Sequence, residues 1–288
     1  MAKHLWEIGM KSVFFTGATG GLGQVCVQAL SGRGWQVFAA GTNEARLAQL
    51  GQLPHVVPVR MDVCSQQSVE DARDAVLQHT DRLDVVVNFA GISAFARLVE
   101  GQALPILQRN LDINLMGTAR VNAVMLPLLE RASGRIVNCS SSVGWTTAQP
   151  FAGAYTASKR ALEGYNDSLR RELMFVSIPV IKLQFGAYNT DMVGQLEAQF
   201  DQTLRQTTRY QAMLQRLWPL MLAVLHSSRD PREVVPVVVK ALESPRPRRQ
   251  YRLGTGWALS LLELLPEGGV DRLYRLLGRL AQGRRKTT

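Results

Sequence analysis

The most informative segment of the chain is Thr16-Gly17-Ala18-Thr19-Gly20-Gly21-Leu22-Gly23, which lies between the apolar run Ser12–Thr16 and a helical pattern. Three of its glycines have separate uses in such a turn. Gly17 allows a tight bend, Gly21 lets the backbone approach a pyrophosphate, and Gly23 permits close packing of the helix on the strand. The N-terminus of the helix then points its free amides at the anion. A glycine-rich turn is common in proteins, but its position between a strand and a helix predicts a dinucleotide-binding unit.

Apolar runs and amphipathic segments continue to alternate as far as Gly186. The apolar runs are rich in Val, Ile and Phe and mostly lack polar–apolar alternation, which is typical of strands buried on both faces. We predict strands at Ser12–Thr16, Gln36–Ala40, Val56–Arg60, Asp84–Asn88, Arg135–Ser140 and Val180–Gln184. We predict helices at about residues 22–32, 44–50, 66–79, 105–131 and 155–176. This order predicts an α/β fold, a Rossmann-type doubly wound parallel sheet that binds its ligand outside the carboxyl ends of the strands.

The remainder of the chain is helical and basic in pattern. Residues 192–226 are predicted to be helical and include the apolar run Leu217–Leu225, and a further helix is predicted at about 231–243. The segment Val270–Leu280 is amphipathic and basic. No repeat and no clear linker interrupts the chain. We therefore predict a single domain over residues 1–288, with a helical substrate lid at about 190–228 and a basic amphipathic C-terminal extension at about 245–288.

The formal net charge is +10, and residues 229–288 hold thirteen Lys or Arg against six Asp or Glu. The late basic residues form a cluster, Arg246, Arg248, Arg249 and Arg252, and a tail, Arg284, Arg285 and Lys286. Nucleic-acid binding would require basic residues interleaved with stacking aromatics. Only Tyr251 and Trp257 lie near the cluster, so we expect no nucleic-acid partner. A solvated basic face and peripheral contact with an anionic membrane surface both remain open.

The cysteines, the histidines and the first residues indicate a reducing compartment and no bound metal. Cys26, Cys64 and Cys139 are too scattered for a disulfide framework, and no Cys or His pair has metal-ligand spacing. The segment Met1–Trp6 has neither the apolar core nor the cleavage site of a signal peptide. No apolar run approaches the roughly 18 residues that span a bilayer. We therefore expect a cytoplasmic protein.

Two further motifs carry groups that can perform chemistry. Tyr155 and Lys159 are four residues apart, so on a helix they share one face and the ammonium can lie beside the hydroxyl. A cation there favours the phenolate and moves the tyrosine pKa from about 10 toward the working pH. The second motif, Asn138-Cys139-Ser140-Ser141-Ser142, ends the fifth predicted strand, and Ser142 lies thirteen residues before Tyr155. Its hydroxyl is placed to hydrogen-bond a substrate oxygen. On its own, each motif is also typical of an ordinary helix surface or loop.

Together the motifs closely resemble those of the short-chain dehydrogenase/reductase family, over about Lys11 to Thr190. The family's Thr-Gly-x-x-x-Gly-x-Gly matches residues 16–23, its Asn-Asn-Ala-Gly appears as Asn88-Phe89-Ala90-Gly91, and its Pro-Gly-x-x-x-Thr appears as Phe185–Thr190. Phe89 and Phe185 depart from the family pattern, although neither position supplies the reacting group. The run Pro245–Tyr251 and the leucine-rich tail resemble the retinol and hydroxysteroid dehydrogenase branch.

The resemblance implies hydride transfer between a nicotinamide and a carbinol or carbonyl carbon. It implies four catalytic residues: Tyr155 moves the proton, Lys159 lowers its pKa and holds the nicotinamide ribose, Ser142 polarises the substrate oxygen, and Asn114 holds a water of the proton relay. The implied cofactor-binding residues are Gly17, Thr19, Gly20, Gly21, Leu22, Gly23, Thr42, Asp62, Val63, Asn88, Ala90, Gly91, Tyr155, Lys159, Tyr188 and Thr190.

The cofactor is expected to be NADP or NAD. An NAD enzyme usually has an acid at the end of the second strand, for the ribose 2′-hydroxyl, and Ala40-Gly41-Thr42-Asn43 contains none. No Arg or Lys stands at the usual positions for a 2′-phosphate either, Gly20 and Thr42. The missing acid favours NADP. Arg46 is a candidate to bind the phosphate, and a solvated helix arginine is the alternative interpretation.

The apolar residues of the predicted lid favour a lipophilic alcohol or ketone, such as a retinoid or a steroid, as the substrate. Core packing is the alternative for these residues, which are Trp218, Leu220, Met221, Leu222 and Leu225. A second possible function, reduction of 3-oxoacyl or keto-sphingoid lipids, would use the same catalytic residues. A third is a non-catalytic dinucleotide-sensing protein, although that class typically lacks the Tyr or the Lys. The resemblance also favours a homodimer or homotetramer built on the Tyr155 helix.

Overall fold

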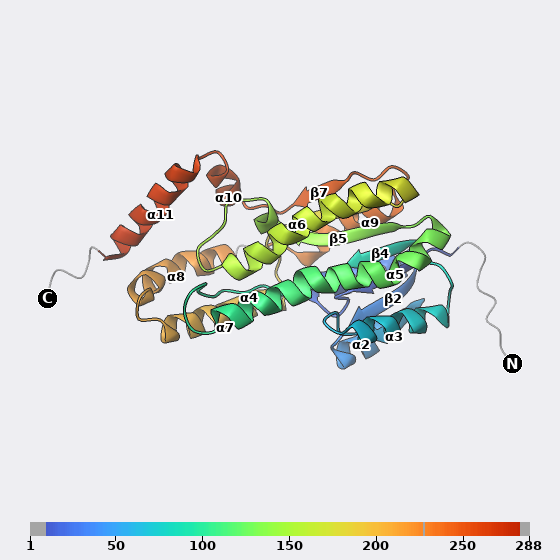
Figure 1. Cartoon of the computed structure of the whole chain (residues 1–288). Coiled ribbons are helices and arrows are strands. Elements are labelled where there is room, and N and C mark those ends of the chain that lie inside the picture. The colour runs from blue at the N-terminus through green and yellow to red at the C-terminus, as the bar shows by residue number, and fades with distance from the viewer. Residues whose placement is uncertain (1–9, 227, 283–288) are drawn as a thin grey trace.

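Seven parallel strands form one sheet in the computed structural model, which describes residues 10–226 and 228–282 (Figure 1). The strands are β1 Ser12–Thr16, β2 Gln36–Gly41, β3 Val56–Arg60, β4 Val85–Asn88, β5 Arg135–Ser141, β6 Val180–Phe185 and β7 Gln250–Leu253. Their order in the sheet is β3-β2-β1-β4-β5-β6-β7, so the direction of winding reverses between β1 and β4. The predicted Rossmann-type doubly wound sheet is confirmed, and ligands of such sheets bind at this reversal.

Helices cover both faces of the sheet, which is why the three central residues of β1 are all apolar. Val13 and Phe15 pack into the core beneath α1 Gly21–Ser31 and α9 Val235–Glu243. Phe14 points to the opposite face, into the core beneath α3 Gln66–Leu77 and α5 Thr118–Ala132. A strand buried on both faces shows no polar–apolar alternation. The remaining layer helices are α2 Glu44–Leu50 on the first face, and α4 Ala103–Leu111 and α6 Gly153–Leu173 on the second.

The six predicted strands are confirmed, and each end lies within one residue of the predicted position. The seventh strand, β7, was not predicted, because its four residues lie in the segment interpreted as a basic cluster. It extends the sheet beyond β6, with Tyr251 opposite Leu183. Tyr251 is buried but Arg252 is exposed. This edge strand therefore lacks the continuous apolar character that marks the inner strands.

Two helices that were predicted as continuous are interrupted. The helix predicted at 105–131 consists of α4, a π-helical turn at Asp112–Gly117, and α5. The helix predicted at 192–226 consists of α7 Asp191–Gln206 and α8 Gln211–His226. Between α7 and α8 the backbone of Thr207 is extended, and its hydroxyl donates to the Glu100 carboxylate at 3.2 Å. The second break thus coincides with a contact to a distant part of the chain, which local patterns do not report.

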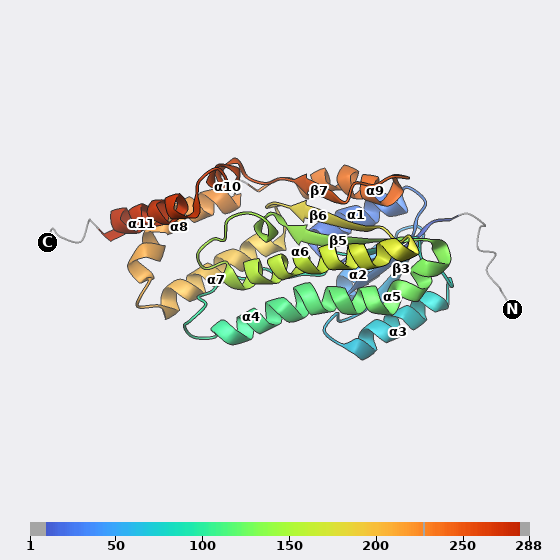
Figure 2. The same ribbon diagram turned by 45° about the horizontal axis from the view of Figure 1, so that its top comes forward.

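The C-terminal helices α10 Trp257–Leu262 and α11 Glu267–Gln282 extend past the end of the sheet beside α8 (Figure 2). They are tied to the loop between β5 and α6. The Thr147 amide donates to the Glu263 carboxylate, and the Tyr274 hydroxyl donates to Gln149. Within the described residues, no helix is both long and apolar enough to cross a membrane. The first residues, Met1–Trp6, and the basic tail Arg284, Arg285 and Lys286 lie outside the described part.

Candidate functional site

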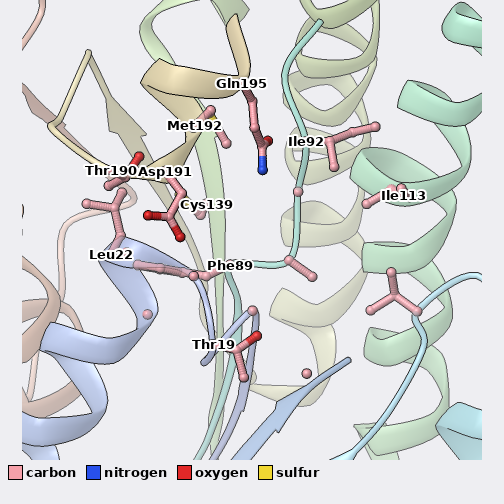
Figure 3. A pocket seen from close by; sticks show the side chains of 18 of the residues that line it. Thr19, Leu22, Phe89, Ile92, Ile113, Cys139, Thr190, Asp191, Met192 and Gln195 are labelled. Atoms are coloured by element: carbon pink, nitrogen blue, oxygen red, sulfur yellow. The ribbon is translucent and has the colours of Figure 1, made fainter. Parts of the chain in front are cut away.

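A cavity of about 980 Å³ lies at the carboxyl ends of the strands, where the strand order reverses (Figure 3). Every predicted cofactor-binding residue except Asn88 lines it: Gly17, Thr19, Gly20, Gly21, Leu22, Gly23, Thr42, Asp62, Val63, Ala90, Gly91, Tyr155, Lys159, Tyr188 and Thr190. Their contact with a cofactor stays a prediction. In the part of the chain that the structure describes, no group of three His, Cys, Asp or Glu side chains could hold a metal ion.

The glycine turn leaves room for a phosphate because side chains are excluded from it. Gly17 has a φ of +67°, and a Cβ there would lie 2.6 Å from the backbone nitrogen of Ala90. A Cβ on Gly23 would lie 2.1 Å from the Gly17 carbonyl oxygen. No side chain caps the start of α1, and its first turn carries no acid. The open helix N-terminus and the bare turn therefore fit the diphosphate of a nicotinamide dinucleotide.

Asn88 does not reach the cavity, which corrects its assignment to the cofactor. Its buried Nδ2 donates to Oδ1 of Asn122 at 2.7 Å and to Oδ1 of Asn138 at 2.8 Å. The Asn138 amide in turn donates to Asn166 at 2.6 Å. These hydrogen bonds connect β4 and β5 to α5 and α6. Asn88 thus fixes the helix layer, while the backbone that follows it, residues 89–91, forms the cavity wall.

Tyr155 and Lys159 lie together on the cavity side of α6. The buried Lys159 ammonium donates to the Cys139 carbonyl oxygen at 2.9 Å and lies 5.9 Å from the centroid of the Tyr155 ring. Burial raises the pKa of Tyr155 to about 12, and a hydrogen bond with Ser141 opposes this rise. Burial also lowers the pKa of Lys159. The predicted lowering of the Tyr155 pKa is therefore wrong here, since burial outweighs the hydrogen bond with Ser141 and the hydroxyl keeps its proton at neutral pH.

The serine beside Tyr155 is Ser141, which corrects the assignment of Ser142. Ser141 lines the cavity, whereas Ser142 starts a turn of 3-10 helix at Ser142–Gly144 and does not reach the cavity. Side chains alternate along a strand, so Cys139 and Ser141 of β5 face the same side. The turn then carries Ser142 away. The separation from the tyrosine is fourteen residues in this chain, one more than the predicted spacing.

Asn114 lies fully buried behind the cavity wall, in the π-helical turn. Its Oδ1 accepts a hydrogen bond from the Ile92 amide at 2.8 Å, and its Nδ2 donates to the Ile92 carbonyl oxygen at 2.9 Å. The same Nδ2 donates to the Ser158 hydroxyl at 2.9 Å. Ser158 precedes Lys159 on α6, so Asn114 connects the loop after β4 with the helix that carries Tyr155. Its role with a water stays a prediction.

The two departures from the family pattern contact each other. The rings of Phe89 and Phe185 meet edge to face, with centroids 6.1 Å apart, and Phe185 packs on Tyr188 at 6.0 Å. The two rings therefore pack together beneath the loop that follows β6. The loop still brings Thr190 over the glycine turn, because a Cβ on Gly21 would lie 2.5 Å from the Thr190 methyl carbon. Both departures are therefore accommodated without loss of the contact between this loop and the turn.

Three apolar side chains from separate elements also line the cavity. They are Ile92 from the loop after β4, Ile113 from the π-helical turn and Met192 from α7 (Figure 3). None of these three residues was predicted. Each adjoins a motif residue in sequence, because Ile92 follows Gly91, Ile113 precedes Asn114 and Met192 closely follows Thr190. Their positions next to the motifs were the signal that could have found them.

The two helices of the predicted lid form a small core of their own. Trp218 of α8 stacks on Phe200 of α7 with ring centroids 3.9 Å apart, and Phe200 packs on Phe95 at 5.1 Å. Neither Trp218 nor Leu222 lines the cavity. Core packing, the alternative interpretation of these residues, is therefore the observed role of Trp218. The side chains of Leu220, Met221 and Leu225 lie outside the described part.

The chain is similar to known proteins over most of its length. A family model described as short chain dehydrogenase matches residues 11–201. The chain is 32% identical to 17-beta-hydroxysteroid dehydrogenase type 6 of Homo sapiens over 267 residues, which cover 88% of this chain and 83% of that protein. It is 31% identical to retinol dehydrogenase 16 of Mus musculus over 293 residues, covering 95% of this chain and 89% of that protein.

Two solved structures have the same fold. A short-chain dehydrogenase from Streptomyces avermitilis superposes with a TM-score of 0.72 at 22% identity, covering 98% of this chain and 100% of that one. A short-chain dehydrogenase from Burkholderia cenocepacia, in complex with NADP, superposes with a TM-score of 0.70 at 23% identity, covering 93% of this chain and 97% of that one.

Gly23→Ala tests the close approach of α1 to the glycine turn. The new Cβ would meet the Gly17 carbonyl oxygen, so α1 must shift. We expect the free energy of unfolding to fall by about 1–3 kcal/mol, and binding of a nicotinamide dinucleotide to weaken by roughly 10-fold. The control is Gly164→Ala on α6, where nothing lies within 4 Å of the new Cβ. This change should stabilise the protein by about 0.5–1 kcal/mol. Urea unfolding and calorimetric titration measure both quantities, and equal behaviour of the two variants would contradict the interpretation.

Proposed function

The chain belongs to the short-chain dehydrogenase family and is an NAD(P)-dependent oxidoreductase of alcohol and carbonyl groups, and we propose that its substrate is lipophilic. The candidate substrates are retinoids, steroids and similar molecules. The position of Tyr155 carries the proposal. Its hydroxyl is hydrogen-bonded to Ser141, its ring centroid lies 5.9 Å from the Lys159 ammonium, and it lines a cavity that apolar side chains also line.

Tyr155 is the group that moves the proton. When bound, the nicotinamide supplies or takes the hydride at the substrate carbon. Because burial holds the Tyr155 pKa at about 12, its hydroxyl is protonated at neutral pH and donates to a carbonyl oxygen. In the direction of alcohol oxidation, the phenol must first release its proton to solvent, and the phenolate oxygen then takes the alcohol proton. Ser141 donates a hydrogen bond to the substrate oxygen and stabilises the charge that develops there.

Lys159 and Asn114 keep Tyr155 in position. The Lys159 ammonium is oriented by the Cys139 carbonyl oxygen and stabilises the phenolate that remains after proton donation. A Cβ on Gly91 would lie 3.1 Å from the Asn114 side-chain oxygen, so glycine lets the loop after β4 lie close to Asn114. Asn114 acts through Ile92 and Ser158, on either side of the reacting groups, and is a positioning residue.

The substrate class is supported by the apolar side chains of the cavity wall. Ile92, Ile113 and Met192 present hydrocarbon, and the polar residues Gln108 and Gln195 lie among the other lining groups. Such a wall, mainly apolar with a few polar groups, suits a rigid or extended hydrocarbon with one oxygen function. The names of two relatives, a 17-beta-hydroxysteroid dehydrogenase and a retinol dehydrogenase, support the same class.

Tyr155→Phe tests the function. The variant removes the proton donor and keeps the ring, so we expect turnover to fall by about 10²–10⁴-fold while cofactor affinity stays within about 2-fold. Turnover is followed by nicotinamide absorbance with a panel of steroids, retinoids, 3-oxoacyl thioesters and keto-sphingoid bases. Near-normal turnover of the variant would contradict the role of Tyr155. Turnover of the wild type on the ketolipids alone would overturn the proposed substrate class.

A pair of serine variants distinguishes Ser141 from Ser142. Because Ser141 is the residue that faces Tyr155, we expect Ser141→Ala to lower kcat by roughly 10²-fold or more, as for other donors to a developing oxyanion. Ser142→Ala leaves the cavity wall unchanged, and its kcat should stay within about 5-fold of wild type. A larger loss for Ser142→Ala than for Ser141→Ala would restore the original assignment.

The C-terminal helix supports peripheral membrane contact as a second element of the proposal. In α11, Leu273 and Leu276 are exposed beside Arg272 and Arg275. Leu264, just before α11, is 77% exposed. A helix with exposed leucines and flanking arginines suits an anionic lipid surface, where lipophilic substrates dissolve.

Vesicle co-sedimentation tests this contact. We expect the protein to pellet with vesicles that contain anionic phospholipid at low salt, and to be released at high salt as the arginine charges are screened. The variant Leu273→Ser with Leu276→Ser should lose vesicle binding and keep its dinucleotide affinity. Equal sedimentation with anionic and neutral vesicles, or none with either, would refute the contact.

A further inference from the structure

One end of the cavity contains an arginine that already has two partners. Arg46 lies in the first turn of α2, and its Nη1 donates to the Thr19 carbonyl oxygen at 2.9 Å. Its Nη2 donates to the Asp191 carboxylate at 2.5 Å. Thr19 belongs to the glycine turn, and Asp191 begins α7 on the other side of the cavity (Figure 3). The guanidinium thus connects the two sides.

The surroundings of Arg46 are those that bind the adenosine ribose in sheets of this type, where the end of the second strand meets the glycine turn. β2 ends at Gly41, and a Cβ there would lie 2.7 Å from the Thr19 hydroxyl oxygen. Thr42, Asn43 and Arg46 follow and line the cavity. The Asn43 side chain accepts a hydrogen bond from the Arg46 amide at 3.0 Å, which fixes the start of α2. Residues 40–43, at the end of β2, include no acid that could bind a ribose 2′-hydroxyl.

The other charged residues of the described cavity wall lie elsewhere or have other partners. The cations are Arg46, Arg109 on α4 and Lys159 beside Tyr155. Among the acids, Asp62 accepts a hydrogen bond from the Cys64 amide at 2.9 Å and is not paired with Arg46. At the ribose end, Arg46 is therefore the cation available to a phosphate, and Asp191 is the anion that holds it.

We propose that Arg46 binds the 2′-phosphate of NADP by exchanging the Asp191 carboxylate for the phosphate, so that Asp191 acts as a built-in competitor. The proposal rests on the NAD(P)-dependent function given above. The Arg46–Asp191 pair is partly solvated, with the Asp191 side chain 62% exposed, and such pairs are weak. A phosphate carries more charge and accepts two parallel hydrogen bonds from one guanidinium, so it displaces the carboxylate. The exchange also releases the start of α7 from the glycine turn.

Arg46→Gln tests the phosphate contact by binding alone. Calorimetric titration with NADP and NAD, and with the fragments adenosine 2′,5′-bisphosphate and adenosine 5′-monophosphate, separates the 2′-phosphate from the rest of the cofactor. We expect a loss of about 10- to 100-fold for NADP and the bisphosphate, and a change of less than about 2-fold for NAD and the monophosphate. The matched control is Arg60→Gln. Arg60 carries the same charge at the end of β3, pairs with Glu44 at the surface and does not line the cavity, so all four affinities should be unchanged.

Asp191→Asn tests the competition. Removing the carboxylate should tighten NADP by about 2- to 5-fold and leave NAD unchanged. In the Arg46→Gln background, Asp191→Asn should leave the affinity for both cofactors unchanged, because the Asp191 carboxylate no longer has a guanidinium to pair with. Equal losses for NAD and NADP in Arg46→Gln would place Arg46 at the diphosphate and overturn the proposal, as would no loss for either. A wild-type protein that binds neither cofactor would instead refute the NAD(P)-dependent function itself.

Discussion

Backbone contact at the glycine turn is the constraint on which the rest of the site depends. Gly17 lies so close to Ala90 that a Cβ would overlap the Ala90 backbone nitrogen, and the Thr16 hydroxyl oxygen accepts hydrogen bonds from the Phe89 and Ala90 amides at 3.2 Å. The turn after β1 and the loop after β4 are therefore one rigid unit at the reversal of the sheet. Ala90 leads to Gly91 and Ile92, which Asn114 holds through paired hydrogen bonds. The glycine turn and the loop that Asn114 holds, residues 90–92, are thus parts of one rigid backbone unit.

The buried Lys159 shows how the backbone at the strand ends determines where the reacting groups lie. An ammonium removed from water must be compensated by hydrogen bonds, and removing its partner leaves an uncompensated charge. The Cys139 carbonyl oxygen at the end of β5 is that partner, so the strand end determines where the cation lies. Because Ser141 follows on the same face of β5, the group beside Tyr155 and the acceptor for Lys159 come from one strand. Burial keeps the Tyr155 hydroxyl protonated, which suits proton donation to a carbonyl.

The sequence predicted what depends on local pattern and missed what depends on contacts between distant segments. The inner strands were predicted to within one residue, because burial on both faces leaves a continuous apolar run. The family motifs predicted most of the cavity wall, because the glycines of a turn are required by the local backbone and are visible in the sequence. Three outcomes were not visible in the sequence pattern. Asn88 turns toward Asn122 and Asn138 instead of the cavity. Ser142 has the expected spacing but lies one residue past the end of β5, in the 3-10 turn, and Trp218 stacks on Phe200 of another helix. The predicted oligomer, domain limits and localisation stay predictions.

The start of α7 contacts three parts of the cavity through three consecutive residues. Thr190 covers Gly21 of the glycine turn, Asp191 pairs with Arg46 beside that turn, and Met192 lines the cavity wall. Since one helical turn carries all three, a shift that breaks the Asp191 contact also moves Thr190 and Met192. If a phosphate takes the place of the Asp191 carboxylate as proposed, the part of the cavity wall that Met192 forms is therefore physically coupled to the occupant of the Arg46 site, and no separate hinge is needed to transmit the change.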